Sequence, residues 1–499
     1  MRRFILYVSV VLLVSCAPKR GGEVVEQQMF TNPLFAGDYP DPSILVDGDD
    51  YYVVHSSFEY YPGLTIYHSR DLVNWRPVQS TLHEYVGSVW APDLCKVDGK
   101  YYIYFPANDK NYVIWADSID GKWSSPIDLN IGHIDPGHVQ GEDGRRYLYF
   151  SSGCYIELSS DGLSTVGELK PSYSGWQIPQ EWSIECFCME GPKIMKRGEY
   201  YYLTVAEGGT AGPATGHMVI SARSKSPVGP WENSPYNPII RAKSVHEKWC
   251  SVGHATVFES NDDKWYMMYH GYENGYYNMG RQTLLAPVEW TDDGWFKVSD
   301  GFMTEKPFAM DYDKGAVGHC LSDDFSQGDL GKRWRWWKES DEGRYSLEGG
   351  ELRIKAKGST IDSSCPLLCT PEHHSYRVTV DVRLEGEAVG GLALFYSEKM
   401  SSGILADSEN VLSNLRGWQF VTKEMAHSGR VSLRLENREN IVDMYYKSEG
   451  EEWQKVENSL DVSACHHNVL SGFMALRIAL VSMGEGEVVF DNFEYEELD

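Results

Sequence analysis

The sequence predicts an all-β protein, a five-bladed β-propeller followed by a β-sandwich. Three observations support this fold class. Hairpins with an aromatic strand recur five times within residues 29–312, longer strands of alternating polarity fill residues 322–499, and no long stretch shows helical periodicity. At 499 residues, 13% of them aromatic, the chain is too long for one ordinary core and suits two folded β domains.

The propeller is predicted from a repeat. Each unit is a hairpin with a strand rich in aromatic residues, and a polar residue stands about ten positions upstream of that strand. Hairpins that recur at spacings of about 40 to 65 residues are typical of propeller blades. The aromatic strands begin at Tyr51, Tyr101, Tyr147, Tyr201 and Trp265, and the upstream residues are Asp41, Asp93, Asp135, Glu190 and His254.

These five upstream residues are expected to share one cavity. Equivalent positions of a propeller are related by rotation about its central channel, so residues at the start of each blade point to one end of that channel. Four carboxylates and one imidazole would then surround a single site. Turn formation is the alternative for any one of them, because Asp-Pro and Asp-Gly are common in turns. Turn formation does not explain why carboxylates recur at equivalent positions of successive repeats, so the repeat favours a shared cavity.

The second domain, residues 322–499, is predicted to be a β-sandwich. Its strands alternate polar and apolar residues, as expected for sheets with one face in a core. Residues 313–321 lack both patterns and are predicted to be a linker. The clearest strands cover residues 351–356, 376–382, 430–435 and 487–493.

The first residues are predicted to be an export signal. A basic tip precedes an apolar run, 4–14, that is too short to span a bilayer. The run ends in a small residue and Cys16, which resembles the lipobox of bacterial lipoproteins and implies a signal peptide at 1–16, acylation of Cys16 and a tether at 17–28. A plain secretory signal with an incidental cysteine is the alternative. The expected location is the bacterial cell envelope, on its periplasmic or outer face, with the lipid anchor as the membrane contact.

Charge and cysteine usage narrow the function further. A net charge of -27 argues against nucleic acid and against an anionic membrane surface as partners, and favours a neutral ligand. Nine cysteines follow Cys16, an odd number without a paired framework. Cys186 and Cys188 lack a second Cys or His pair at zinc-finger spacing, so buried thiols or one or two disulfides are expected instead of zinc.

Asp41, Asp135 and Glu190 are candidates for the hydrolysis of a glycosidic bond. That reaction needs one acid to protonate the leaving oxygen and one carboxylate on the opposite face of the sugar. Asp41 and Glu190 each precede a rigid Pro or Gly-Pro step, which fixes the backbone as the chain enters a strand. Three acids in one cavity cannot all stay ionised cheaply, so at least one should hold a proton near neutral pH.

Short motifs follow one another in a specific order: Asn32-Pro33-Leu34, Pro40-Asp41-Pro42-Ser43, Trp90-Ala91-Pro92-Asp93, Ile134-Asp135-Pro136, Glu190-Gly191-Pro192, Ala206-Glu207-Gly208-Gly209-Thr210, Gly253-His254 and Gly280-Arg281-Gln282. In this order and spacing they resemble glycoside hydrolase family 43, over nearly the whole chain after the signal. The resemblance implies a five-bladed propeller and an inverting enzyme, exo-acting or endo-acting.

The resemblance also implies roles for the carboxylates. Asp41 would be the general base that activates water, and Glu190 the general acid. Asp135 would orient Glu190 and raise its pKa through like-charge repulsion, so that Glu190 stays protonated near neutral pH. Asp93 and Glu207 are expected to belong to the framework, although Asp93 is in phase with the other acids.

Four further residues match substrate-binding positions of that family. Phe58 and Trp90 would form walls of the sugar pocket, with core packing as the alternative. Arg281 would bind sugar hydroxyls, or else form a structural ion pair. His254 would lie near the channel axis, either hydrogen-bonded or as a ligand of calcium, directly or through water. The resemblance implies that no cofactor is required. The one metal that it implies is calcium in the central channel.

The second domain resembles the lectin-like, concanavalin-like jelly-roll sandwich of family members active on xylo-oligosaccharides and arabinose side chains. It could lend a loop to the pocket, brace the propeller or bind glycan separately. The resulting prediction is an exo-acting, inverting hydrolase that removes terminal β-D-xylose or α-L-arabinofuranose from plant cell-wall polysaccharide or oligosaccharide. The alternatives are an endo-acting arabinanase or xylanase and a non-catalytic glycan-binding surface lipoprotein. A retaining, fructosidase-like propeller is disfavoured because its Asn-Asp-Pro-Asn and Arg-Asp-Pro motifs do not occur.

Overall fold

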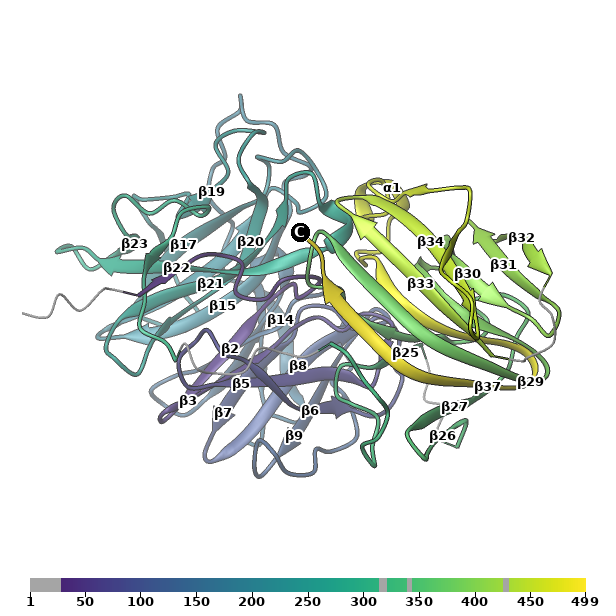
Figure 1. The fold of residues 1–499 in the computed structure, drawn as a ribbon. Helices are drawn as coiled ribbons and strands as arrows, with labels where there is room; N and C mark the ends of the chain where they lie inside the picture. Colours follow the sequence, from purple (N-terminus) through teal and green to yellow (C-terminus); the bar gives the residue numbers. More distant parts are fainter. Residues whose placement is uncertain (1–27, 314–320, 339–342, 425–429) are drawn as a thin grey trace, which may run out of the picture.

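The computed structural model describes residues 28–313, 321–338, 343–424 and 430–499. The chain is nearly all β and forms two domains that pack side by side, as Figure 1 shows with the propeller in purple to teal and the sandwich in green to yellow. This confirms the predicted fold class. Cys16, the predicted signal peptide and nearly all of the predicted linker lie outside the described residues.

The propeller consists of five antiparallel sheets, one per blade. The first holds β2 (Ser43–Asp47), β3 (Asp50–Val54), β5 (Gly63–Ser69) and β6 (Arg76–Leu82); the second, β7 (Asp93–Val97), β8 (Lys100–Ala107), β9 (Lys110–Ala116) and β10 (Ile127–Asp128); the third, β11 (Gly137–Gln140), β12 (Arg146–Tyr149), β13 (Cys154–Leu158) and β14 (Thr165–Pro171). The fourth holds β15 (Met189–Arg197), β16 (Tyr200–Glu207), β17 (Met218–Ser224), β18 (Glu232–Asn233) and β19 (Ile240–Arg241); the fifth, β20 (Trp249–Glu259), β21 (Trp265–Glu273), β22 (Arg281–Trp290) and β23 (Phe296–Val298). Short elements join them: β1 (Met29–Phe30), β4 (Tyr60–Tyr61), β24 (Phe308–Ala309) and the 3-10 helices η1 (Ser151–Gly153) and η2 (Tyr277–Met279).

The first strands of the blades close a ring around the channel. The first strand of each blade contacts the first strand of the next blade, in the order β2, β7, β11, β15, β20 and back to β2. The two ends of the propeller are joined by β1, which pairs with β24. The residues that enter these inner strands therefore surround one axis, as the repeat predicts.

The aromatic second strands form the cores between blades. Ile103 of the second blade and Val54 of the first are fully buried in one such core, and Tyr149 and Tyr269 are fully buried in the third and fifth blades. Burial of a side chain of this size contributes roughly 1.5–3 kcal/mol. The recurrent aromatic strands of the sequence are thus explained by the packing of one blade on the next.

The second domain is a curved sandwich built around two long antiparallel strands, β29 (Tyr376–Ser397) and β37 (Arg477–Glu497). Gly386, Gly484 and Gly486 have positive φ where these strands bend from one layer into the other. One half of β29 pairs with β33 (Arg430–Arg438), the other with β30 (Met400–Ala406). The remaining elements are β25 (Arg335–Trp337), β26 (Tyr345–Glu348), β27 (Glu351–Lys355), β28 (Leu367–Cys369), β31 (Asn410–Leu415), β32 (Trp418–Glu424), β34 (Ile441–Ser448), β35 (Gln454–Lys455), β36 (Leu460–Asp461) and the helix α1 (His467–Leu470).

The two domains share backbone hydrogen bonds. Strand β25 of the sandwich pairs with β4 of the propeller, so that Trp336 lies opposite Tyr61 and Trp337 opposite Tyr60. Phe58 and Tyr60 belong to the same apolar core as the interior of the sandwich. The sandwich is therefore continuous with the propeller wall next to the channel.

Cys186 and Cys188 form a disulfide, so one of the expected disulfides joins the pair that the sequence singled out. Within the described ranges, no helix has the length and apolar character needed to cross a membrane.

Candidate active site

A pocket at one end of the channel brings together all seven residues predicted to act in catalysis or sugar binding. It also includes residues of the connecting loops and one residue of the sandwich. Its lining consists of Asp41, Phe58, Trp90, Ala91, Ile134, Asp135, Glu190, Thr210, His254, Arg281 and Phe473.

Asp93 does not line this pocket, so the predicted ring of four carboxylates is wrong at this position, whereas its assignment to the framework agrees with the structure. Asp93 is the first residue of β7 and forms an ion pair with Lys193 at 2.6 Å. It also accepts a hydrogen bond from the backbone N–H of His138 at 2.8 Å. Asp41 and Asp135 stand two residues before their strands, and in the second blade that place is taken by Ala91.

The backbone at three pocket residues is left-handed. Asp41, Asp135 and His254 have φ of 58°, 57° and 51°, a conformation that is rare outside glycine. Such strained residues cluster at functional sites, where the surrounding structure holds them. For Asp41 and Asp135 the following proline restricts the backbone further. Each carboxylate is thereby aimed into the channel instead of along its strand.

Glu190 lies near the start of β15, where a bulge interrupts the pairing with β16 between Glu190 and Lys193. Gly191 has φ of 60°, and a Cβ on it would lie 2.9 Å from Nδ1 of His254. Only glycine allows this approach of the strand to the imidazole. The Glu-Gly step of the motif therefore places the carboxylate of Glu190 beside His254.

Asp41 is buried and surrounded by donors. Arg281 contacts both of its oxygens, Nη1 at 3.0 Å from Oδ1 and Nη2 at 3.3 Å from Oδ2, and the Ser56 hydroxyl donates to Oδ2 at 2.5 Å. Burial alone would raise the pKa of Asp41, but the charges of Arg281 and His254 outweigh it and hold that pKa well below its ordinary value. Asp41 is therefore ionised across the neutral range. Arg281, predicted to bind sugar, both lines the pocket and forms this ion pair.

Asp135 and Glu190 differ in protonation. Burial, helped by the charges of Glu190 and Asp41, raises the pKa of Asp135 to about 7. Burial also acts on Glu190, but hydrogen bonds from His217 and His254 outweigh it and lower the pKa of Glu190 below its ordinary value. These opposite shifts of the two pKa values favour Asp135 as the member of the pair that holds a proton near neutral pH. That Asp135 keeps Glu190 protonated through like-charge repulsion stays a prediction, and the two imidazoles beside Glu190 act against it.

Three histidine rings form the floor around these acids. The ring centroid of His254 lies 5.1 Å from that of His270 and 5.9 Å from that of His217. Nε2 of His217 lies 3.3 Å from Oε1 of Glu190, and a Cβ on Gly253 would overlap the His217 ring. The sequence did not single out His217 or His270. His217 stands directly before β17 and His270 within β21, and neither position carries a local motif.

The donor atoms of Glu190, His217 and His254 lie within 4.8 Å of one another. Calcium takes six to eight oxygen ligands, whereas this group offers two imidazoles and one carboxylate. Burial lowers the pKa of His254, but the charges of Asp41 and Asp135 outweigh it and raise that pKa to about 9, so the imidazole is cationic at neutral pH. As direct ligands these three residues do not fit calcium, and contact of His254 with calcium through water stays a prediction.

Aromatic side chains from both domains wall the pocket. Phe58 and Trp90 come from the propeller, and Phe473 comes from the loop after α1 of the sandwich. The Phe473 ring lies 5.7 Å from Trp90 and 5.4 Å from the guanidinium of Arg281, and it stacks on His467 at 3.7 Å. The sandwich therefore lends a loop to the pocket, one of the roles that the sequence left open. Phe473 has no sequence signal, because only the docking of the domains brings it there.

Known proteins share this architecture. Residues 30–296 match the family described as "Glycosyl hydrolases family 43", and residues 322–496 match the "Beta xylosidase C-terminal Concanavalin A-like domain". The non-reducing end α-L-arabinofuranosidase BoGH43B of Bacteroides ovatus is 28% identical, with 95% of this chain and 96% of that protein covered. The xylan 1,3-β-xylosidase of a Vibrio species is 27% identical, with 93% and 99% covered. The crystal structure of a xylan β-1,4-xylosidase from Bacillus halodurans superposes with a TM-score of 0.83 at 27% identity, over 94% of this chain and all of that one.

Proposed function

This chain belongs to glycosyl hydrolase family 43, and on that premise we propose that it is an exo-acting, inverting glycosidase that removes terminal β-D-xylose or α-L-arabinofuranose from plant cell-wall glycans. Relatives that span nearly its whole length carry the names of these two activities. One observation carries the proposal most directly. A single pocket holds an ionised carboxylate, Asp41, and a pair of acids, Asp135 and Glu190, that retains one proton.

Asp41 suits the general base. Its pKa is well below the ordinary value, so it is ionised and can accept a proton from water. Arg281 and Ser56 hold both carboxylate oxygens, which fixes the direction from which water is activated. Orientation of this kind lowers the entropic part of the barrier.

Glu190 suits the general acid because it is the least buried of the three carboxylates. It must hold the proton when the leaving oxygen arrives. A leaving oxygen that accepts a hydrogen bond from the protonated form raises the pKa of Glu190. His254 faces both acids, with Nε2 3.4 Å from Oε1 of Glu190 and 3.7 Å from Oδ2 of Asp135. The cationic imidazole can give its Nε2 proton to Glu190 and take the proton of Asp135 in its place.

The arrangement also supports inversion. The imidazole of His254 lies between base and acid, with Nδ1 3.3 Å from Asp41 and Nε2 3.4 Å from Glu190. Two carboxylates separated by an imidazole ring and two contacts are compatible with the ~6.5–9.5 Å that inverting glycosidases need to admit a water molecule. A direct nucleophilic attack requires a shorter separation, of roughly 5 Å.

Exo action is supported by the walls of the pocket. Phe473 of the sandwich closes the side of the pocket where Trp90 and Arg281 lie. A polysaccharide that runs through an endo-acting site needs a groove open at both ends. A pocket walled from both domains suits one terminal sugar.

The test is hydrolysis of aryl β-D-xylopyranoside and aryl α-L-arabinofuranoside by the wild type and by Asp41→Asn. An activated leaving group lessens the need for the general acid, so the base variant is the cleaner control. Turnover that collapses in the variant, with inversion of the anomeric configuration seen by NMR, supports the proposal and identifies the preferred sugar. Retained configuration would contradict the role of Asp41. Cleavage of intact arabinan or xylan without turnover of the aryl glycosides would indicate endo action. Binding of these glycans without cleavage would indicate a glycan-binding protein.

We further propose export and lipid anchoring through Cys16. The basic tip, apolar run and cysteine at the start of the chain support it. The Cys186–Cys188 disulfide is also in keeping with an oxidising compartment. Metabolic labelling with a radioactive fatty acid, compared between wild type and Cys16→Ser, tests the anchor, because label that persists in the variant would contradict it.

A further inference from the structure

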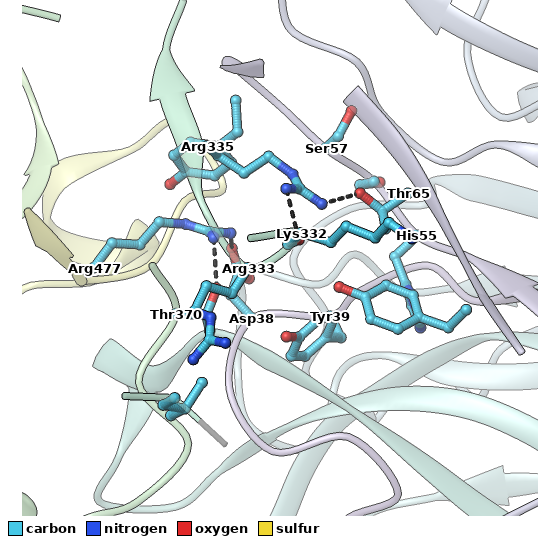
Figure 2. Close-up of a pocket in the computed structure, with 14 residues that line it drawn as sticks. Asp38, Tyr39, His55, Ser57, Thr65, Lys332, Arg333, Arg335, Thr370 and Arg477 are labelled. Atoms are coloured by element: carbon cyan, nitrogen blue, oxygen red, sulfur yellow. Dashed lines mark hydrogen bonds and ion pairs between the residues drawn. The ribbon is translucent and has the colours of Figure 1, made fainter. Parts of the chain in front are cut away.

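A second cavity lies between the two domains, separate from the candidate active site. We call it the interdomain cavity. It has a volume of about 60 Å³, and its lining consists of Asp38, Tyr39, His55, Ser56, Ser57, Tyr60, Thr65 and Tyr67 of the propeller and Leu321, Lys332, Arg333, Arg335, Thr370 and Arg477 of the remaining chain. Figure 2 shows that Arg335 and Arg477 extend from the sandwich toward the propeller residues Thr65 and Asp38.

The lining is strongly cationic. Four of its side chains are lysine or arginine, and Asp38 is its one carboxylate. Two of the cations, Arg335 and Arg477, are more than nine-tenths buried, whereas Lys332 is exposed on the solvent side. A buried cation without a balancing charge is costly, because it loses its hydration and gains no counter-charge.

Arg335 has no balancing carboxylate in the described parts of the chain. Its guanidinium donates to the backbone carbonyls of Lys332 at 2.8 Å and Trp334 at 2.6 Å and to the hydroxyl of Thr65. All three acceptors are neutral. Burial lowers the pKa of Arg335, which reflects the same lack of compensation, yet an arginine stays charged in proteins.

Asp38 is the carboxylate that faces Arg477, and burial of Arg477 is outweighed so that its pKa lies above the ordinary value. One oxygen of Asp38 lies 3.3 Å from Nη2 of Arg477, and the other oxygen has no hydrogen-bond partner among the described residues. Burial raises the pKa of Asp38 to about 6, so part of its charge is lost just below neutral pH. Arg477 also donates to Thr370 at 2.5 Å and lies 3.6 Å above the Tyr60 ring, and both partners are neutral.

The cavity contains unpaired hydrogen-bond donors and has room for a small ligand. Nε of Arg477 and the hydroxyl of Ser57 have no hydrogen-bond partner within the described ranges of the chain. A single water needs about 10–15 Å³ of such space, so the cavity has room for a few waters or one small polyatomic ion. Waters would satisfy the donors but would leave the charge of Arg335 uncompensated.

We propose that the interdomain cavity binds a small inorganic anion, held between Arg335 and Arg477. The anion supplies the negative charge that Arg335 lacks, and its size class is that of a halide or a phosphate. Because the lining comes from both domains, the anion binds only when they are docked, and it stabilises that arrangement by linkage. Docking also brings Phe473 to the candidate active site, so occupancy strengthens a pocket to which the anion makes no contact.

Diffraction with bromide gives the direct test. Crystals of the protein without its signal peptide are soaked in sodium bromide, and anomalous scattering locates the ions. We expect a peak in the interdomain cavity within contact distance of the guanidinium groups of Arg335 and Arg477. Bromide peaks confined to the outer surface, with only solvent density in the cavity, would overturn the proposal.

Thermal unfolding gives the second test. At constant ionic strength and neutral pH, chloride or phosphate replaces gluconate, which is too large for the cavity. The unfolding temperature of the wild type is expected to rise by about 1–3 °C between 1 and 100 mM of the bound anion, and the more effective salt identifies it. Equal unfolding temperatures in all three salts would count against an anion site.

A pair of variants assigns the effect to the cavity. Arg335→Gln removes the buried charge and should abolish the salt-specific rise, while Arg76→Gln, at an exposed arginine on β6 outside the cavity, should leave it intact. A salt-specific rise that persists in Arg335→Gln would contradict the proposed site. If Arg335→Gln does not fold, the bromide peaks of the wild type still decide the question.

Discussion

Arg281 binds Asp41 through both guanidinium nitrogens, at 3.0 and 3.3 Å from the two carboxylate oxygens. Both residues are almost completely buried, and β22 brings Arg281 to Asp41 across 240 positions of sequence. A bidentate arginine fixes the plane of a carboxylate as well as its charge. The base of the proposed reaction is therefore oriented by the last blade of the propeller.

The first prediction concerns this pair. Arg281→Lys is expected to lower kcat/KM by about 10- to 100-fold, because the bidentate charged hydrogen bonds are lost. The acid limb of the pH profile should also move to higher pH. Arg281 holds the pKa of Asp41 down, so a weaker contact lets that pKa rise and the base is protonated sooner as the pH falls. Ser56→Ala, which removes a neutral donor to the same carboxylate, is the matched control and should move the limb less. An unmoved acid limb in Arg281→Lys would contradict this account.

The second prediction concerns Asp135. The proton of the Asp135–Glu190 pair is lost as the pH rises through about 7, so kcat/KM of the wild type should fall above that pH. In Asp135→Asn the like charge disappears while His217 and His254 still lower the pKa of Glu190, so the basic limb should shift to lower pH. An aryl glycoside with a strongly activated leaving group should show a smaller shift, because it needs less acid catalysis. A basic limb that keeps its position in Asp135→Asn would show that the pair does not share this proton.

The repeat explains why much of this site was predictable. Blades related by rotation place equivalent residues at one end of the channel, so Asp41, Asp135, Glu190 and His254 could be assigned to one pocket from spacing alone. Asp93 was wrongly assigned to the pocket because its distance from the aromatic strand fits the repeat. The order of proline and aspartate distinguishes these acids: Asp41 and Asp135 precede their prolines, whereas Asp93 follows Pro92.

Other parts of the site could not be found in the sequence. His217 reaches Glu190 across the fourth blade, and His270 of the fifth blade reaches Asp41 at the entry to the first. Phe473 depends on how the sandwich docks, and docking depends on the pairing of β25 with β4, two strands of three and two residues. The lowered pKa of Glu190 depends in part on His217, a residue for which the sequence has no local motif. Local patterns predicted the blades, and contacts between distant segments decided the electrostatics.

The third prediction concerns Phe473. Phe473→Ala is expected to raise KM for the aryl glycosides by roughly 10-fold or more with a smaller change in kcat, because the ring is a wall of the pocket and carries no reacting group. Phe420→Ala is the matched control, since Phe420 is an exposed phenylalanine on β32 of the same domain outside the pocket. Steady-state kinetics separate the two parameters. Equal kinetics of the two variants would mean that the sandwich loop does not contribute to binding.

The last prediction concerns Glu207, which the sequence assigned to the framework. Its Oε1 accepts the backbone N–H of Trp176 at 2.8 Å, and its Oε2 is buried with no partner within the described residues. Burial raises the pKa of Glu207 from 4.5 to about 7, against the smaller effect of that hydrogen bond. The folded chain therefore binds this proton more tightly than the unfolded chain does. The stabilisation is complete below pH 4.5 and is lost as the pH rises through 7.

Glu207→Gln removes this dependence. The amide oxygen can keep the bond from Trp176, and no charge has to be buried at high pH. The variant should be more stable than the wild type at pH 8, by up to about 3 kcal/mol, with little difference at pH 4.5. Differential scanning calorimetry at the two pH values, with the exposed Glu185→Gln as control, measures the effect. A difference in unfolding temperature that is the same at both pH values would show that Glu207 does not titrate with folding.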